Sequence, residues 1–191
     1  MKQKVQSYGR DPNQFKIMPG VVPFVGKTQE EAEQKLEHFQ ELILPELGIG
    51  MLSRYLGIDL TNYSPDSQLP DVPSLDEYNG EKGRFKILSE LSKRENLTIR
   101  QLGRLFARGQ GHLFVVGSGN QVADKLSEWF LNGACDGFNV KIPYLPGGLK
   151  DFVEYVTPEL QNRGLFREEY EGSTLRDHLG LDDPKVKVKQ F

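Results

Sequence analysis

The chain has few of the residues that build disulfide frameworks and metal centres. Its 191 residues include one cysteine, Cys135, and three histidines that lie far apart in the sequence. A single cysteine excludes an internal disulfide and is typical of a reducing cytoplasm, which is the location we expect. The histidine and cysteine spacings of zinc sites are missing too, so the sequence predicts no metal cofactor.

Long apolar runs and an excess of positive charge are missing as well. No run approaches the ~20 apolar residues of a membrane helix, and the polar start Met1-Lys2-Gln3-Lys4 is unlike a signal peptide. The formal net charge is −3, and no basic stripe alternates with aromatic residues. We therefore expect neither a membrane nor a nucleic acid as a partner. The 37% hydrophobic and 27% charged content is typical of a folded, soluble chain.

The residues that are present alternate between strand and helix patterns. Strands are expected in the apolar runs at 15–25, 113–116 and 138–142. Helical spacing follows each run, and Thr28 with Glu31 forms a capping box at the first helix. This alternation predicts an α/β fold with parallel strands and right-handed crossovers. Three parallel strands would leave two exposed sheet edges, so we expect the chain to be part of something larger.

Residues 46–110 interrupt the alternation. Helices are expected there at 47–56, 84–93 and 99–108, and residues 61–83 are rich in Gly, Pro, Asp and Ser without any periodicity. Irregular segments of this length are often functional lids. We interpret 46–110 as an insertion between two strand-helix units. At the other end of the chain, 171–191 reads as a surface tail in which 185–189 are expected to be mobile.

One segment carries the clearest strand-turn-helix signal. Val115 to Leu126 reads as a strand, a glycine turn and an amphipathic helix, and a second strand follows at 138–142. Such a unit places a loop at the carboxyl end of its strand, where α/β proteins put their chemistry. The turn Gly117-Ser118-Gly119 would offer free N–H groups and a helix dipole to a phosphate. A plain turn with an N-capping serine explains the same residues.

Matching islands of sequence spread over nearly the whole chain. They include Tyr8-Gly9-Arg10-Asp11-Pro12, Val25-Gly26-Lys27-Thr28-Gln29-Glu30-Glu31-Ala32, Gly111-His112, Asp136-Gly137-Phe138-Asn139, Pro143-Tyr144-Leu145-Pro146-Gly147-Gly148 and Gly172-Ser173-Thr174-Leu175-Arg176. In this order they resemble the carboxyl-terminal part of the flavin-dependent monooxygenases typified by nitrilotriacetate monooxygenase component A, the pristinamycin synthase large subunit and dibenzothiophene-sulfone monooxygenase, within the bacterial luciferase-like superfamily. One departure is Ser118-Gly119, where the family pattern usually has Thr-Pro.

The resemblance implies a partial TIM-type (β/α)8 barrel. On this interpretation residues 1–191 are the carboxyl-terminal portion of a luciferase-like barrel domain, supplying about the last three βα units plus the insertion. Members of the family oxygenate a small organic substrate with O2 and reduced FMN, which a separate flavin reductase delivers. Most of their FMN contacts lie in the amino-terminal half, so no catalytic residue can be assigned here.

Four residues are candidates for a cofactor or substrate pocket. Ser118 has the turn position described above. His112 precedes the strand at 113–116, and it reaches the barrel mouth only if the insertion folds back; otherwise it is a capping or turn histidine. Asn139 is polar on an apolar strand, and Tyr144 follows the carboxyl end of that strand. A buried amide needs partners, which backbone, flavin or substrate would supply.

Two other interpretations remain open. On the first, the chain is a non-catalytic truncated or split half-barrel that needs an amino-terminal partner chain for flavin binding. Alternatively, it forms a homo-oligomer of half-barrels that binds flavin or another phosphate compound without oxygenating anything.

Overall fold

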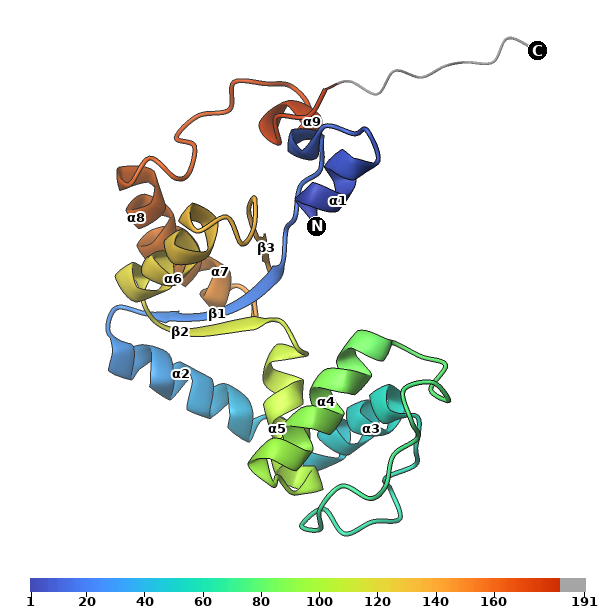
Figure 1. The fold of residues 1–191 in the computed structure, drawn as a ribbon. Coiled ribbons are helices and arrows are strands. Elements are labelled where there is room, and N and C mark those ends of the chain that lie inside the picture. Colours follow the sequence, from blue (N-terminus) through green and yellow to red (C-terminus); the bar gives the residue numbers. More distant parts are fainter. Residues whose placement is uncertain (183–191) are drawn as a thin grey trace, which may run out of the picture.

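The fold rests on a three-stranded parallel sheet, and the structure, a computed structural model, describes residues 1–182 (Figure 1). The strands are β1 (Gly20–Gly26), β2 (Leu113–Ser118) and β3 (Asn139–Val140). Their order is β2-β1-β3, with Val21 beside Leu113 and Gly20 beside Asn139. In a barrel, strands that follow one another in the sequence are neighbours, so β2 would lie between β1 and β3. Here β1 lies in the middle instead.

Helices cover both faces of this sheet. Figure 1 shows α2 (Gln29–Glu41) on one face and α6 (Gly119–Leu131), α7 (Gly147–Asp151) and α8 (Thr157–Asn162) on the other. Val21 and Val25 of β1 pack into the second layer with Val122 and Val156. Phe24 points to the opposite face, where its ring contacts Phe39 of α2 at a centroid distance of 5.2 Å. Because both faces are covered, β1 reads as a continuous apolar run rather than an alternating one.

The segment between α2 and β2 has a hydrophobic core of its own. It contains α3 (Pro45–Leu56), α4 (Lys82–Glu95) and α5 (Ile99–Gly109). We call its buried apolar set the insertion core: Leu52, Leu56, Leu60, Tyr78, Phe85, Leu88, Ile99, Leu102 and Phe106. The corresponding set around β1 is the sheet core: Val21, Val25, Val122, Ala123, Leu126 and Val156. The interpretation of 46–110 as an insertion between barrel units stays a prediction.

Two expected strands are shorter than their apolar runs. The first begins at Gly20 instead of residue 15, because the backbone at 17–19 is engaged by the loop before β3: Ile17 N–H donates to the Asp136 carboxylate (2.9 Å), and Asp136 N–H donates to the Ile17 carbonyl (2.8 Å). The third is confined to Asn139 and Val140, both exposed at the sheet edge. Burial of Asn139 on an apolar strand was therefore a wrong expectation.

The last long helix is interrupted, as the proline in it predicts. A π-helical turn, Phe152–Val156, separates α7 from α8. Pro158 has no N–H to donate, and just before it the Thr157 N–H bonds to the Phe152 carbonyl, five residues back. The chain then runs to α9 (Leu175–His178). Just beyond it, Asp182 bonds to Gln14 of the 3-10 turn Pro12–Gln14, which follows α1 (Lys2–Ser7).

Some expectations concern membranes and the end of the chain. No helix within residues 1–182 is both long enough and apolar enough to cross a bilayer. The expected mobility of 185–189 lies outside the described residues.

Candidate functional site

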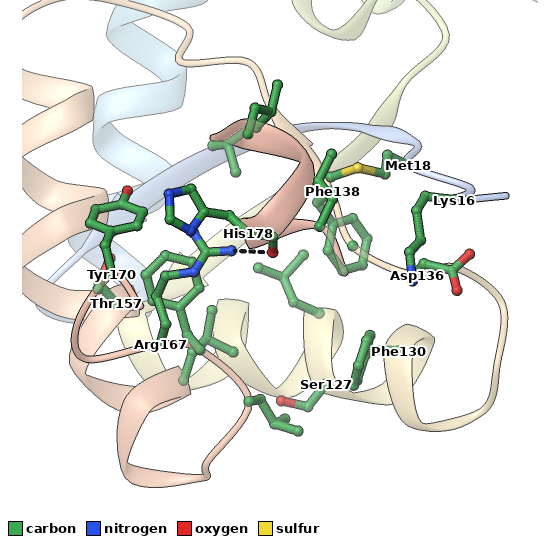
Figure 2. A pocket seen from close by; sticks show the side chains of 18 of the residues that line it. Lys16, Met18, Ser127, Phe130, Asp136, Phe138, Thr157, Arg167, Tyr170 and His178 are labelled. Carbon is green, nitrogen blue, oxygen red and sulfur yellow. Dashed lines mark hydrogen bonds between the residues drawn. The ribbon is translucent and has the colours of Figure 1, made fainter. Parts of the chain in front are cut away.

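A cavity of about 670 Å³ lies near the amino ends of the strands (Figure 2). Met18 precedes β1 and Phe138 precedes β3, and both line this cavity together with side chains of α6, α8 and the segment after α8. None of the four predicted site residues is among its lining residues. Within residues 1–182, no group of three or more His, Cys, Asp or Glu side chains is placed to hold a metal ion.

The four predicted residues are divided between the two ends of the sheet. Ser118 pairs with Gly26 at the carboxyl ends of β2 and β1. Tyr144 lies near the same end, with its ring 6.0 Å from that of Phe24. Asn139 pairs with Gly20 at the amino end of β1, and a Cβ on Gly20 would meet the His112 ring at 2.5 Å. The structure therefore does not bring the four together in one pocket.

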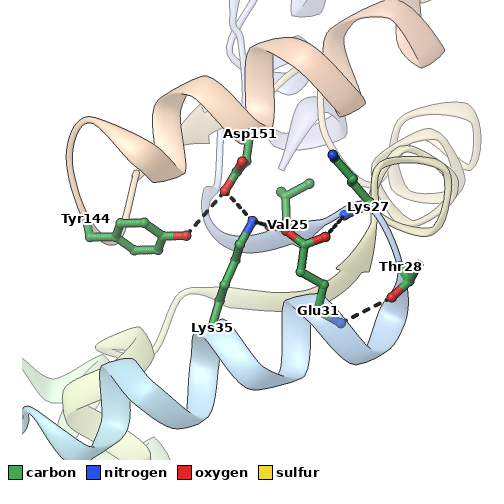
Figure 3. A network of polar contacts seen from close by, with 7 residues as sticks. All are labelled: Val25, Lys27, Thr28, Glu31, Lys35, Tyr144 and Asp151. Atoms are coloured by element: carbon green, nitrogen blue, oxygen red, sulfur yellow. Dashed lines mark hydrogen bonds and ion pairs between the residues drawn. The ribbon is translucent and has the colours of Figure 1, made fainter.

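The carboxyl end of β1 carries a polar network, which we call the Lys35 network: Glu31, Lys35, Tyr144 and Asp151 (Figure 3). The Lys35 ammonium of α2 donates to Asp151 Oδ2 (2.8 Å) and to the Val25 carbonyl (3.2 Å), and it pairs with Glu31 Oε1 (2.8 Å). The Tyr144 hydroxyl donates to the same Asp151 oxygen at 3.3 Å. The network thus ties α2 to the loop and helix that follow β3.

The protonation states of the network suit binding and positioning better than proton transfer. Burial disfavours the Lys35 ammonium, but hydrogen bonds to Asp151 and Glu31 outweigh it and raise the pKa of Lys35 above its usual range. Burial, with the nearby Asp151 carboxylate, also raises the pKa of Tyr144. At neutral pH Lys35 is charged and Tyr144 is a neutral donor. Neither group is poised as a general base.

Sequence reasoning found Tyr144 but missed Lys35 and Asp151. The Glu31–Lys35 half of the network has a local signal, because residues four apart on a helix are neighbours. The Lys35–Asp151 contact joins residues 116 positions apart. Nothing in the sequence around either residue indicates that contact.

Ser118 caps α6. The Ser118 N–H donates to Gln121 Oε1 (2.8 Å), and the Gln121 N–H donates to Ser118 Oγ (3.4 Å), which completes a capping box. A side chain at Gly119 would overlap the Tyr155 carbonyl of the π-helical turn. Packing therefore explains the glycine at 119. With its polar groups bonded to one another, this turn does not form a phosphate cradle by itself.

At the amino end, His112 and Asn139 contact nearby polar groups. His112 Nε2 lies 3.0 Å from Lys141 Nζ, and burial together with the charges of Lys141 and Arg84 lowers the pKa of His112. A neutral imidazole accepts this hydrogen bond from Lys141. The Asn139 amide donates to the Met18 carbonyl at 3.2 Å, so backbone supplies the partner of this exposed side chain.

An FMN molecule would find few contacts among these groups. At the carboxyl end of the strands, the Lys35 ammonium is bonded to three oxygens and the Ser118 turn bonds to Gln121. The described residues at this end do not fit a flavin phosphate on their own, so we derive no catalytic step through the cofactor.

Comparisons with known proteins place the chain among monooxygenases, although no protein-family model matches it. It is 46% identical over 189 residues to nitrilotriacetate monooxygenase component A of Aminobacter aminovorans, covering 98% of this chain and 41% of that protein. It is 45% identical over 185 residues to N-acetyl-S-(2-succino)cysteine monooxygenase of Bacillus subtilis (strain 168), covering 96% of this chain and 42% of that protein. The chain thus spans less than half the length of these relatives.

Solved structures agree with the sequence comparison. DmoA from Hyphomicrobium sulfonivorans matches 93% of this chain, and this chain covers 36% of it, with a TM-score of 0.75 at 28% identity. Riboflavin lyase (RcaE), solved with modified FMN and riboflavin, matches 96% of the chain, which covers 39% of it, with a TM-score of 0.72 at 26% identity. Over nearly its whole length, the chain is therefore similar to one part of the monooxygenases represented by nitrilotriacetate monooxygenase component A.

Proposed function

We propose that this chain is the carboxyl-terminal portion of a two-component, FMN-dependent monooxygenase that oxygenates a small organic substrate. Reduced FMN would come from a separate reductase. The observation that carries the proposal is the 45–46% identity to two monooxygenases over 96–98% of the chain. Because the chain covers only 41–42% of those relatives, the activity requires the remaining part of such a protein.

The physical role of the chain would be to complete a barrel wall. Among the described residues β3 pairs only with β1, and it is two residues long with Val140 37% exposed. Free strand edges are templates for further pairing. In the completed barrel, we propose that β1–β3 belong to about the last three βα units. Pairing with the remaining strands would move β2 into the middle position that sequential barrel order requires.

The Lys35 network marks the end of the sheet where we expect the flavin and substrate. Barrel enzymes place their chemistry at the carboxyl ends of the strands. Ser118 and Tyr144 lie at that end and remain our predicted pocket residues. His112 and Asn139 lie at the other end, so they contribute to a pocket only if completion of the barrel rearranges the amino end.

We infer a polycarboxylate as the substrate class. Nitrilotriacetate and N-acetyl-S-(2-succino)cysteine, after which the two relatives are named, both carry several carboxylates. The chain is 39% identical to dibenzothiophene-sulfone monooxygenase of Rhodococcus erythropolis, whose named substrate is uncharged. This third relative supplies a contrasting substrate for the test.

A chimera tests the proposal. The part of nitrilotriacetate monooxygenase component A that this chain does not match would be fused to residues 1–191 and supplied with reduced FMN and O2. We expect oxygenated product from nitrilotriacetate and none from dibenzothiophene sulfone. The parent enzyme, with its own matching region, serves as the control. A folded chimera that binds FMN but releases only hydrogen peroxide with either substrate would favour the non-catalytic half-barrel instead.

A further inference from the structure

The segment that follows α8 forms one wall of the cavity near the amino ends of the strands. We call residues 163–182 the C-terminal arm. At one end, the Leu165 N–H donates to the Leu160 carbonyl (2.9 Å) and Gln161 Nε2 donates to the Arg167 carbonyl (2.9 Å). At the other end, the Asp182 N–H donates to Gln14 Oε1 (2.8 Å). The arm is therefore attached at both ends, and Figure 1 shows its path from α8 to α9. Residues between these attachments line the cavity.

The walls of this cavity are apolar on both sides. The body of the protein contributes Met18, Leu126, Phe130, Phe138 and Phe152. The arm contributes Phe166, Tyr170 and Leu175, whose exposed fractions are 43%, 70% and 73%. These arm side chains face a space that the described residues leave unfilled. A volume of about 670 Å³ lies within the range of small-molecule sites.

The charged groups that line the cavity leave a positive excess. They are Lys16, Asp136 and Arg167. Asp136 is already compensated, since it pairs with Lys2 and accepts the Ile17 N–H at 2.9 Å. Among residues 1–182, no carboxylate lies within ion-pair distance of Lys16 or Arg167.

Arg167 is held in place by the arm itself. Its guanidinium lies 5.3 Å from the centroids of both the Phe166 and the Tyr170 rings, and Nη2 donates to the His178 carbonyl at 3.3 Å. Figure 2 shows Arg167, His178 and Tyr170 grouped on one side of the cavity and Lys16 on the other. A guanidinium fixed in this way loses little freedom on binding and offers a planar fork of donors, which suits a carboxylate.

We propose that this cavity binds an amphipathic monoanion, an apolar molecule with one carboxylate. The carboxylate pairs with Arg167, and the apolar body packs against the Phe130 and Phe138 walls. This site is separate from the carboxyl end of the strands, where the Lys35 network lies. It does not depend on the chain having oxygenase activity.

Fluorescence titration of the chain tests the site. The probe is 8-anilinonaphthalene-1-sulfonate, an aromatic anion whose emission rises in apolar surroundings, and the competitors are decanoate and its neutral analogue 1-decanol. We expect one probe molecule per chain and displacement by decanoate at a concentration at least tenfold lower than for decanol, because hydrogen bonds to charged groups contribute about 1.5–3 kcal/mol. Equal displacement by the two competitors would overturn the proposal.

Matched variants locate the binding. Arg167→Gln should weaken decanoate binding about tenfold and leave decanol binding unchanged. Arg167→Lys should weaken decanoate binding less, because it keeps the charge but loses the planar fork. Arg94→Gln, on an exposed arginine away from the cavity, is the control. Leu175→Trp fills the cavity and should abolish probe binding, whereas Leu131→Trp, at a similarly exposed leucine (70% against 73%), should not. Equal losses for Arg167→Lys and Arg167→Gln, or for the two tryptophan variants, would contradict the assignment. Circular dichroism confirms that each variant is folded.

Discussion

The insertion core and the sheet core are built in different ways. The insertion core joins residues between Leu52 and Phe106, so one continuous segment supplies every member. The sheet core joins Val21 to Val122 and Val156, on either side of that segment. The insertion core is complete within the chain. The sheet core is covered on both faces but ends at strand edges that no described residue pairs.

This difference indicates which of the two cores the proposed completion of a barrel would affect. Local contacts form early and cost little loop-closure entropy, so a continuous helical segment can fold by itself. The sheet unit must bring distant segments together, and its short edge strand β3 adds only two residues of pairing. Completion of a barrel would therefore stabilise the sheet core far more than the insertion core.

Among the substitutions predicted below, the largest loss of stability should come from replacing Phe24 at the centre of the sheet unit. Its fully buried ring contacts Phe39, Phe114 and Tyr144. We expect Phe24→Ala to lower the free energy of unfolding by about 3–5 kcal/mol, measured by urea denaturation. Hydrogen exchange should rise in β1, β2 and α2 while α3–α5 keep their protection. Equal loss of protection in the insertion would show that the two cores unfold as one unit.

A smaller loss of stability is expected where α3 and α5 cross in the insertion core. A Cβ on Gly103 would lie 3.1 Å from the carbonyl carbon of Gly48, so α3 and α5 would have to separate. Gly103→Ala should destabilise by about 1–3 kcal/mol. Gly50→Ala on the open side of α3, where a Cβ meets nothing within 4 Å, should instead stabilise by about 0.5–1 kcal/mol. Thermal melts of both variants compare the signs; a neutral Gly103→Ala would mean that the crossing is loosely packed.

The Lys35 network should make the stability of the sheet unit, unlike that of the insertion core, depend on alkaline pH. Because the pKa of Lys35 is raised in the folded state, its stabilising contribution is fully present below about pH 10 and is lost as pH rises through the folded value. Asp151→Asn should cost about 1–2 kcal/mol at pH 7 and flatten this alkaline loss. Denaturation between pH 7 and 11 measures it, with Asp124→Asn, at a more exposed ion pair with Arg163, as control. An unchanged alkaline slope in Asp151→Asn would contradict this account.

The sequence predicted those parts of the fold whose signals are local. The Thr28 cap located the start of α2 and the N-capping Ser118 the start of α6, and Pro158 accounts for the interruption of the last helix. The strand order and the strand lengths could not be predicted, because pairing partners are set by distant segments. Tyr144 was identified from its place after a strand, but its partners Lys35 and Asp151 meet only through the tertiary fold.

His112 should give the smallest effect and report on the junction between the two regions. Burial and the charges of Lys141 and Arg84 lower its pKa, so the folded state binds this proton less well than the unfolded state. Titration of His112 therefore leaves the free energy of unfolding unchanged above about pH 6.5. It lowers the free energy of unfolding as the pH drops through that value towards the pKa of His112 in the folded state. Lys141→Met removes one repelling charge 3.0 Å away, so NMR titration should show the His112 pKa shifting upward. Lys150→Met, on α7, should leave it unchanged. Because Arg84 belongs to α4, Arg84→Met should shift the pKa in the same direction only if the insertion keeps its observed position against the sheet.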